Sequence, residues 1–327
     1  MADHQGQMPR KKTRIGIALG SGSARGWAHI GVLRELADMG IQPEIVAGCS
    51  IGSVVGAAYA ADNVDRLEKQ IISLTKLEMV RFFELNASFN GFVRKDRLQQ
   101  FFHEHVCAEL QTVEGLGRKF ATVATCLNSG REIWFTEGKV MDAVMASIAL
   151  PGLFPPFAYQ EQWLVDGGLV NPVPVSLCRA LGADIVIAVN LNGSVTRRPF
   201  ANKKQATVDK LDKAEAAEMV DNKPEPEAAP ARLLSNVAAS LKGYSAALFP
   251  NKGSNNVPSL VDAITGSINI MQDKITRSRM AGDPPEVLLS PKLADIGLLE
   301  FYRAQEAIAA GRECVQRMRH EIEAQLT

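Results

Sequence analysis

A serine lies between two glycines in the segment Gly48-Cys49-Ser50-Ile51-Gly52, which matches the pattern GxSxG. A β-branched run precedes the segment and the small-residue run SVVGAAYAA follows it, so the pattern predicts a sharp turn between a buried strand and a helix. We expect Gly48 and Gly52 to let the backbone pass close on either side, with the Ser50 hydroxyl at the positive end of the helix. This arrangement predicts a nucleophilic serine. The alternative is a turn that only links strand to helix.

A nucleophilic serine needs a base, and histidine is the usual one. The chain has five histidines, and none of them stands in a turn-rich loop after a predicted strand. A Ser-His-Asp arrangement would therefore have to use a helical residue such as His29 or His320. We keep that arrangement as a rival within the same chemistry.

A carboxylate offers the base that the histidines do not. Asp166-Gly167-Gly168 follows a strand-like run at residues 162–165, and its two glycines indicate a tight turn that leaves the carboxylate accessible. We predict that Asp166 takes the proton of Ser50 directly. A carboxylate is a weaker base than imidazole, so the prediction also requires a desolvated pocket and good stabilisation of the oxyanion.

A second loop of small residues follows the first predicted strand, where residues 20–26 are GSGSARG. Its backbone N–H groups can converge on an anion, and we predict an oxyanion hole in the segment Gly22, Ser23, Ala24 and Arg25. A serine can replace a glycine as an N–H donor if its φ is negative, so the exact donors within this segment stay open.

The side chain of Arg25 has two interpretations, as an anchor of this loop or as a solvated residue in the first turn of the helix. Arg25 also stands where a dinucleotide-binding loop that starts at Gly20 would need its last glycine. The second predicted strand ends at Ser50 and not at an acidic residue, which further weakens the nucleotide-binding alternative.

Strand and helix patterns alternate around these motifs. Residues 14–19, 44–50 and 184–191 are β-branched runs typical of buried parallel strands. Residues 119–127 and 131–137 add a predicted hairpin, because Asn-Ser-Gly between them is a turn signal. The alternation predicts an α/β fold with three α/β/α layers and a mainly parallel central sheet. The functional loops of such a fold lie at the carboxyl ends of its strands.

Helical patterns fill much of the remaining chain. An apolar stripe at 27–37 should end at Gly40, and the block 62–109 could cover one side of the site as a lid. Residues 260–280 and 298–325 are further predicted helical segments.

The organisation that we predict has four parts. Residues 1–12 form a flexible tail, 13–195 a catalytic core, 196–257 a low-complexity insertion that is partly disordered, and 258–327 a helical segment packed on the core. Within the insertion, 231–250 has an apolar helical face that would touch lipid or shield the acyl pocket. The alternative for this stretch is an ordinary core helix.

Composition limits the classes of function. The 36 basic and 36 acidic residues give a formal charge of zero, so no global field would recruit nucleic acid. Five cysteines without a CxxC pair argue against a disulfide framework and against a metal site, and we expect no cofactor. We see no export signal and no apolar run of ~18 residues. These features favour the cytoplasm, with membrane contact, if any, peripheral at the inner face.

The three motifs in this order resemble the patatin-like phospholipase family, and in particular its bacterial RssA-like subgroup. The runs that carry the resemblance are ARGWAHIGVL (24–33), IVAGCSIGSVVGAAYA (45–60), ALPGLFPP (149–156), LVDGGLVNPVPVSL (164–177), LGADIVIAVN (181–190) and RSRMAGDPPEVLL (278–289). The usual family loop GGGxRG loses two glycines here, at Ser21 and Ser23.

The resemblance implies a patatin-like fold and a Ser-Asp dyad of Ser50 and Asp166. It also implies hydrolysis of acyl esters, lipids above all, with a lipid or acyl-ester substrate as the binding partner. The oligomeric state stays open. A rival from another class is a regulatory or scaffold protein that keeps the fold and binds a partner through residues 196–250.

Overall fold

The computed structural model describes residues 12–76, 78, 95–193 and 260–326. The chain forms two compact units, one made of residues 1–197 and 269–327 and the other of residues 198–268. The fold and the site described below belong to the first unit.

Within the described residues, eight strands form one mixed sheet in the order β5-β6-β3-β2-β1-β7-β8, with β4 paired to β3 off this path. The strands are β1 (Ile15–Leu19), β2 (Ile45–Cys49), β3 (Lys119–Cys126), β4 (Glu132–Phe135), β5 (Phe157–Tyr159), β6 (Gln162–Asp166), β7 (Ile185–Val189) and β8 (Val287–Leu289). The pairs β1–β2, β1–β7, β2–β3 and β7–β8 are parallel, whereas β4, β5 and β6 pair in antiparallel fashion. The predicted mainly parallel sheet is confirmed.

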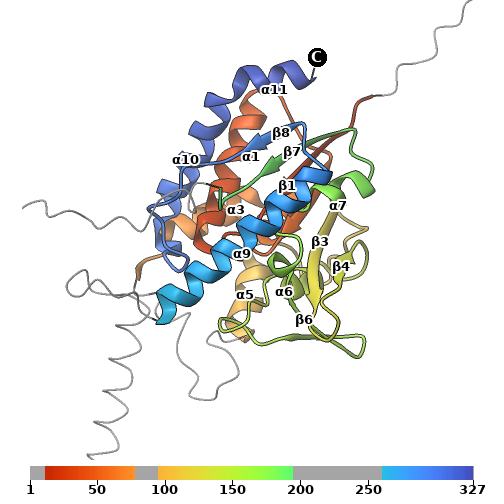
Figure 1. The fold of residues 1–327 in the computed structure, drawn as a ribbon, viewed down its shortest axis with the longest axis vertical. Coiled ribbons are helices and arrows are strands. Elements are labelled where there is room, and N and C mark those ends of the chain that lie inside the picture. The colour runs from red at the N-terminus through yellow and green to blue at the C-terminus, as the bar shows by residue number, and fades with distance from the viewer. Residues whose placement is uncertain (1–11, 77, 79–94, 194–259, 327) are drawn as a thin grey trace, which may run out of the picture. The chain divides into compact units, whose positions relative to one another are not determined.

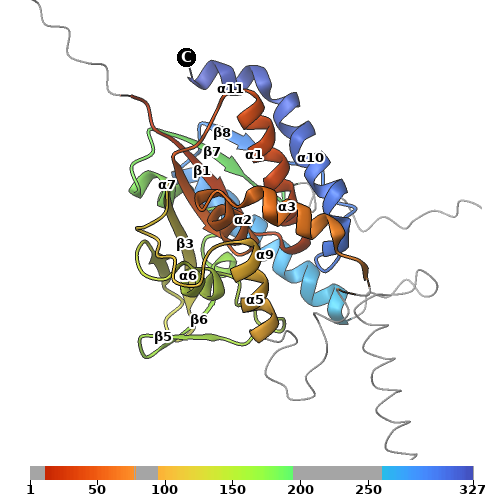
Figure 2. The same cartoon turned by 180° about the vertical axis from the view of Figure 1, so that it is seen from behind.

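Helices cover both faces of this sheet, as Figures 1 and 2 show from opposite sides. The helices are α1 (Ala28–Asp38), α2 (Ile51–Ala60), α3 (Val64–Ser73), α5 (Lys95–His105), α6 (Val140–Ser147), α7 (Val175–Ala180), α9 (Leu260–Gly282), α10 (Ala304–Arg317) and α11 (Arg319–Leu326), with 3-10 turns η1 (Ser23–Trp27), η2 (Gly167–Leu169) and η3 (Phe301–Arg303). Helices α1, α2, α3 and α10 share one apolar core with the sheet. On the other face, α7 packs in a second cluster that Met280 of α9 also joins. The three-layer α/β/α fold is therefore confirmed.

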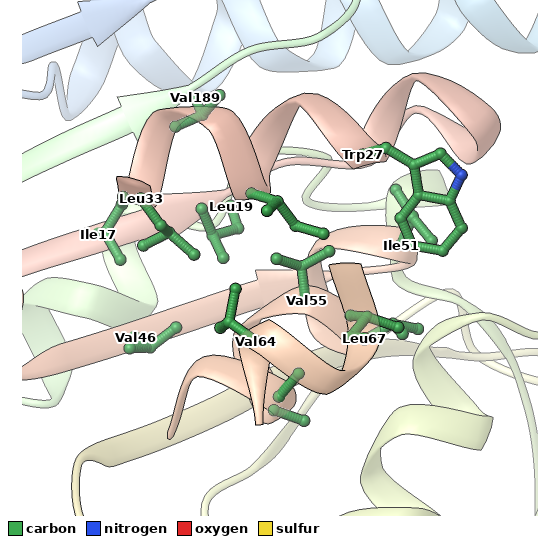
Figure 3. Close-up of a cluster of buried hydrophobic side chains, with 14 of the residues drawn as sticks. Ile17, Leu19, Trp27, Leu33, Val46, Ile51, Val55, Val64, Leu67 and Val189 are labelled. Carbon is green, nitrogen blue, oxygen red and sulfur yellow. The ribbon is translucent and has the colours of Figure 1, made fainter. Parts of the chain in front are cut away.

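The central strands are buried on both faces. Leu19, Val46 and Val189 project from β1, β2 and β7 into the larger core, where they lie beside Leu33 of α1 and Val55 of α2 (Figure 3). A strand covered on both sides has no polar face, so its sequence is a continuous apolar run. This is why the three runs could be recognised as parallel strands.

Two glycines let α1 and α10 cross at close range. A methyl group placed on Gly31 would lie 1.9 Å from the carbonyl oxygen of Ile308, and one on Gly311 would lie 2.1 Å from that of Ala28. Any larger residue at either position would push the helices apart. The crossing holds the C-terminal part of the chain against α1, directly after the loop of η1.

Several predicted elements are present. β3 and β4 form the expected hairpin. Helix α1 ends shortly before Gly40, which has a φ of 77°, as predicted for a helix-terminating glycine. Of the block at 62–109, α3 and α5 are described, whereas residues 79–94 lie outside the described residues, and the lid stays a prediction. Residues 1–11 of the predicted tail and the insertion with its helix at 231–250 also lie outside them. No described helix is long and apolar enough to cross a membrane.

Candidate active site

Ser50 occupies a strained turn between β2 and α2. Its φ of 54° and ψ of −124° are unusual for a residue with a side chain and cost about 1–3 kcal/mol. The backbone N–H of Ser50 donates to Ser147 Oγ at 2.9 Å, which helps to hold this conformation. Methyl groups on the flanking glycines would collide with backbone, at 2.5 Å from Ser53 Cα for Gly48 and 2.1 Å from the Leu19 oxygen for Gly52.

The register of β3 brings Asp166 to Ser50. β2 and β6 pair with the same edge of β3, because β4 occupies the opposite edge across both stretches. Cys49 at the end of β2 pairs with Val123, and Asp166 at the end of β6 pairs with Ala124, the next residue. β2 and β6 thus run toward each other along this edge and end at neighbouring positions. Ser50, directly after β2, and Asp166, the last residue of β6, therefore lie close together.

The meeting produces a direct hydrogen bond. Ser50 Oγ donates to Asp166 Oδ2 at 2.6 Å, and the backbone N–H of Gly168 donates to Asp166 Oδ1 at 2.7 Å. Gly167 has no room for a side chain, because a methyl group there would lie 2.2 Å from the Val123 oxygen. The carboxylate is therefore held by both of its oxygens, with one oxygen facing the serine.

Burial makes Asp166 a stronger base than an exposed carboxylate. The side chain is almost completely enclosed, and this desolvation raises its pKa from 3.8 to about 6, although the hydrogen bonds from Ser50 and Gly168 act to lower the pKa. A carboxyl group with a pKa of about 6 is mostly ionised at neutral pH. It can therefore accept a proton and later return it.

The two candidate histidines lie elsewhere. His29 is buried in α1, its Nε2 is 2.8 Å from the Gly20 oxygen, and burial lowers its pKa to about 4. The neutral ring therefore donates Nε2–H to the carbonyl group. His320 is fully exposed on α11, 4.0 Å from Glu323. Among the described residues, neither imidazole has a hydrogen bond to the serine.

The small-residue loop lies beside the nucleophile. A methyl group on Gly26 would lie 2.2 Å from a side-chain carbon of Ile51, so η1 packs directly on the first turn of α2. Ser23 has a φ of 53°, so the condition of a negative φ is not met, although its N–H group can still act as a donor. Its hydroxyl donates to the Leu298 oxygen at 2.6 Å, which offsets part of the backbone strain.

Two of the four predicted oxyanion donors have other partners. The N–H of Ala24 donates to the Leu298 oxygen at 3.0 Å, and that of Arg25 donates to the Gly22 oxygen at 3.3 Å, which closes the 3-10 turn. The N–H groups of Gly22 and Ser23 have no hydrogen bond to another described residue. Only these two remain as candidates for an oxyanion hole.

Arg25 anchors the loop, and the solvated interpretation is wrong. Its guanidinium is buried, which lowers its pKa to about 10. It donates from Nε to the Gly22 oxygen at 3.3 Å and from Nη2 to Asn269 Oδ1 at 2.7 Å. Asn269 lies on α9, a helix that the sequence did not indicate as part of the site.

No group of three or more His, Cys, Asp or Glu side chains in the described ranges is placed to hold a metal ion. All five cysteines are free and buried. The arrangement of a strained serine, a buried carboxylate and free amides suits nucleophilic attack on a carbonyl carbon.

Comparison with known proteins agrees with this chemistry. Residues 17–179 match the family model for patatin-like phospholipase. An uncharacterised NTE family protein of Mycobacterium tuberculosis is 31% identical, and the alignment covers 91% of this chain and 89% of that protein. Lysophospholipase NTE1 of Yarrowia lipolytica is 30% identical over 55% of this chain and 13% of its own length. VipD from Legionella pneumophila has a TM-score of 0.41 at 10% identity, covering 94% of this chain and 66% of that one, which is too distant to support an argument.

The chain therefore belongs to the patatin-like phospholipase family, a family of lipid hydrolases, and is a hydrolase of carboxylic ester bonds. The two relatives named above with NTE in their names are a bacterial and a fungal protein. The narrower RssA-like subgroup stays a prediction.

Proposed function

We propose that this protein hydrolyses lipid acyl esters with Ser50 as nucleophile and Asp166 as the only side-chain base. The observation that carries the proposal is the 2.6 Å hydrogen bond from Ser50 Oγ to Asp166 Oδ2. As Oγ attacks the ester carbonyl carbon, its proton passes to the carboxylate. Asp166 then gives the proton to the departing alcohol oxygen, which leaves an acyl group on Ser50. Water attacks this acyl ester in the same way, and the fatty acid is released.

The amides of Gly22 and Ser23 are the proposed oxyanion hole. Their loop packs on the first turn of α2, and they have no hydrogen bond to another described residue. Each such donor typically contributes about 10²–10³ in rate, because the negative charge that it stabilises forms only during the reaction. This stabilisation of the oxyanion compensates for the weaker base in a mechanism that uses a carboxylate and no imidazole.

We propose a lysophospholipid as the substrate class, because a similar fungal protein carries the name lysophospholipase. The free, buried cysteines favour a reducing cytoplasm as the place of action. Contact with a membrane surface would then be peripheral, at the inner face.

The test compares purified wild type with Ser50→Ala and Asp166→Asn on p-nitrophenyl acyl esters and on lysophosphatidylcholine. We expect each variant to lose about 10³-fold or more in kcat, because the two residues act as one unit. Ser129→Ala and Asp65→Asn are matched controls at exposed positions and should retain the wild-type rate. Fluorophosphonate should label wild type at Ser50. Activity that survives both site substitutions would refute the dyad, whereas loss of activity in a histidine variant alone would favour the Ser-His-Asp rival.

A further inference from the structure

Helix α9 turns a polar face inward, onto the loops of the site. From Asn269 onward it belongs to the same unit as the sheet, and its buried residues there are Asn269, Gln272, Asp273 and Thr276. Their spacing of three and four residues puts them on one face of the helix. Buried polar groups require partners, and two of these residues, Asn269 and Gln272, find theirs on the loops of the site.

Gln272 joins three loops at once. Its Oε1 accepts a hydrogen bond from Ser21 Oγ at 2.9 Å and another from Asn192 Nδ2 at 2.8 Å. Its Nε2 lies against Gly168, where an added methyl group would come within 2.4 Å of it. One side chain therefore contacts the loop after β1, the loop after β7 and the turn that holds Asp166.

Asn269 acts on the oxyanion loop through Arg25. Its Oδ1 accepts from Arg25 Nη2 at 2.7 Å, and the same guanidinium donates from Nε to the Gly22 oxygen. No carboxylate forms an ion pair with Arg25 in the described part of the chain, so Asn269 is the side chain that fixes its position. Losing this acceptor would leave a buried charged donor without its partner.

Because the peptide bond is planar, fixing the carbonyl group of Gly22 also fixes the orientation of the Ser23 N–H group. The carbonyl oxygen of Gly22 and the N–H of Ser23 belong to one peptide plane and point in opposite directions. Holding the oxygen with the backbone N–H and the Nε of Arg25 therefore sets the direction of the Ser23 N–H. The positive φ of Ser23 makes an external constraint necessary, because a relaxed loop would leave this conformation.

We propose that Asn269 and Gln272 are positioning residues for ester hydrolysis, which aim the oxyanion loop at the carbon that Ser50 attacks. This rests on the proposed function, in which Gly22 and Ser23 supply the oxyanion donors. The two residues do not touch the reacting atoms. Because they act on groups that bind the oxyanion, their loss should lower kcat and leave KM nearly unchanged.

The test uses variants of the full chain. Asn269→Leu and Gln272→Met keep size and remove the acceptor oxygen, and we expect kcat to fall about 10- to 100-fold, less than the loss of a donor itself. Asn269→Asp keeps an acceptor for the Arg25 guanidinium and should stay within about threefold of wild type. Lys274→Ala, on the exposed face of α9, is the control. Circular dichroism establishes that each variant is folded.

The outcomes separate the two proposals. If Ser50→Ala is inactive but Asn269→Leu and Gln272→Met keep the wild-type kcat, the positioning role is refuted and the dyad stands. A rise in KM alone, or a loss in Asn269→Asp equal to that in Asn269→Leu, also refutes it. If one apolar variant fails to fold, the other apolar variant decides the question. Activity in Ser50→Ala would instead refute the function on which the inference rests.

Discussion

Replacing Asp166 with asparagine should inactivate the enzyme and stabilise its fold. Asparagine has the same shape, so its Oδ1 can still accept from Gly168 N–H and its Nδ2 can donate to Ser50 Oγ. The substitution therefore removes a buried charge without leaving a polar group unpaired. In wild type the buried charge lowers the free energy of unfolding, because the carboxylate is kept away from water. The variant has no such charge.

The pKa of Asp166 gives the size of the expected increase in the free energy of unfolding. Burial raises the carboxyl pKa from 3.8 to about 6, a shift of about two pH units, which corresponds to roughly 3 kcal/mol. Because the folded state binds the proton more tightly, wild type is relatively most stable below pH 3.8 and loses this contribution as the pH rises through about 6. The variant should therefore exceed wild type by up to about 3 kcal/mol near pH 8, and the difference should vanish near pH 4.

Urea unfolding of the two proteins at these two pH values measures the difference. Asp65→Asn is the control, because it removes the same charge from a side chain that is 85% exposed, and its ion pair with Arg34 is worth only about 0–1 kcal/mol. An Asp166→Asn protein that is no more stable than wild type near pH 8 would refute the argument that burial destabilises the carboxylate.

Two further predictions concern pH and packing. For wild type, kcat/KM should fall tenfold per pH unit below about 6, because only ionised Asp166 accepts the proton; a profile flat to about pH 4.5 would contradict this. Gly311→Ala should lower the free energy of unfolding by about 1–3 kcal/mol or more, because its methyl group would lie 2.1 Å from the Ala28 oxygen. Gly282→Ala, with open space around it, is the control, and equal melting temperatures for the two variants would contradict the packing argument.

The sheet could be predicted from the sequence because its central strands are buried on both faces. Such strands are continuous apolar runs, and the turn residues between β3 and β4 are equally local signals. The contact between Ser50 and Asp166 spans 116 positions. It could be anticipated only because both residues stand at the carboxyl ends of predicted strands. The pairing of β2 and β6 with one edge of β3 explains why those two strand ends meet.

The part played by α9 could not be predicted in the same way. A polar stripe on an amphipathic helix normally faces water. Asn269, Gln272 and Thr276 form such a stripe, and only the tertiary structure shows that it faces the site. The link between Arg25 and Asn269 spans 244 positions, with no local signal at either end. Likewise, the composition of the loop gave no indication that the Ala24 and Arg25 amides would be engaged within the fold.

The separation of two buried charges explains why Arg25 pairs with Asn269 and not with Asp166. The pKa of Asp166 is set by burial, the Ser50 hydroxyl and the Gly168 N–H, and the guanidinium is not among its causes. If Arg25 paired with Asp166, the nearby positive charge would lower the carboxyl pKa and weaken the only base that the proposed mechanism has. Asn269 satisfies the guanidinium without supplying a negative charge. The loop is therefore anchored by a cation, while the carboxylate keeps the basicity that burial gives it.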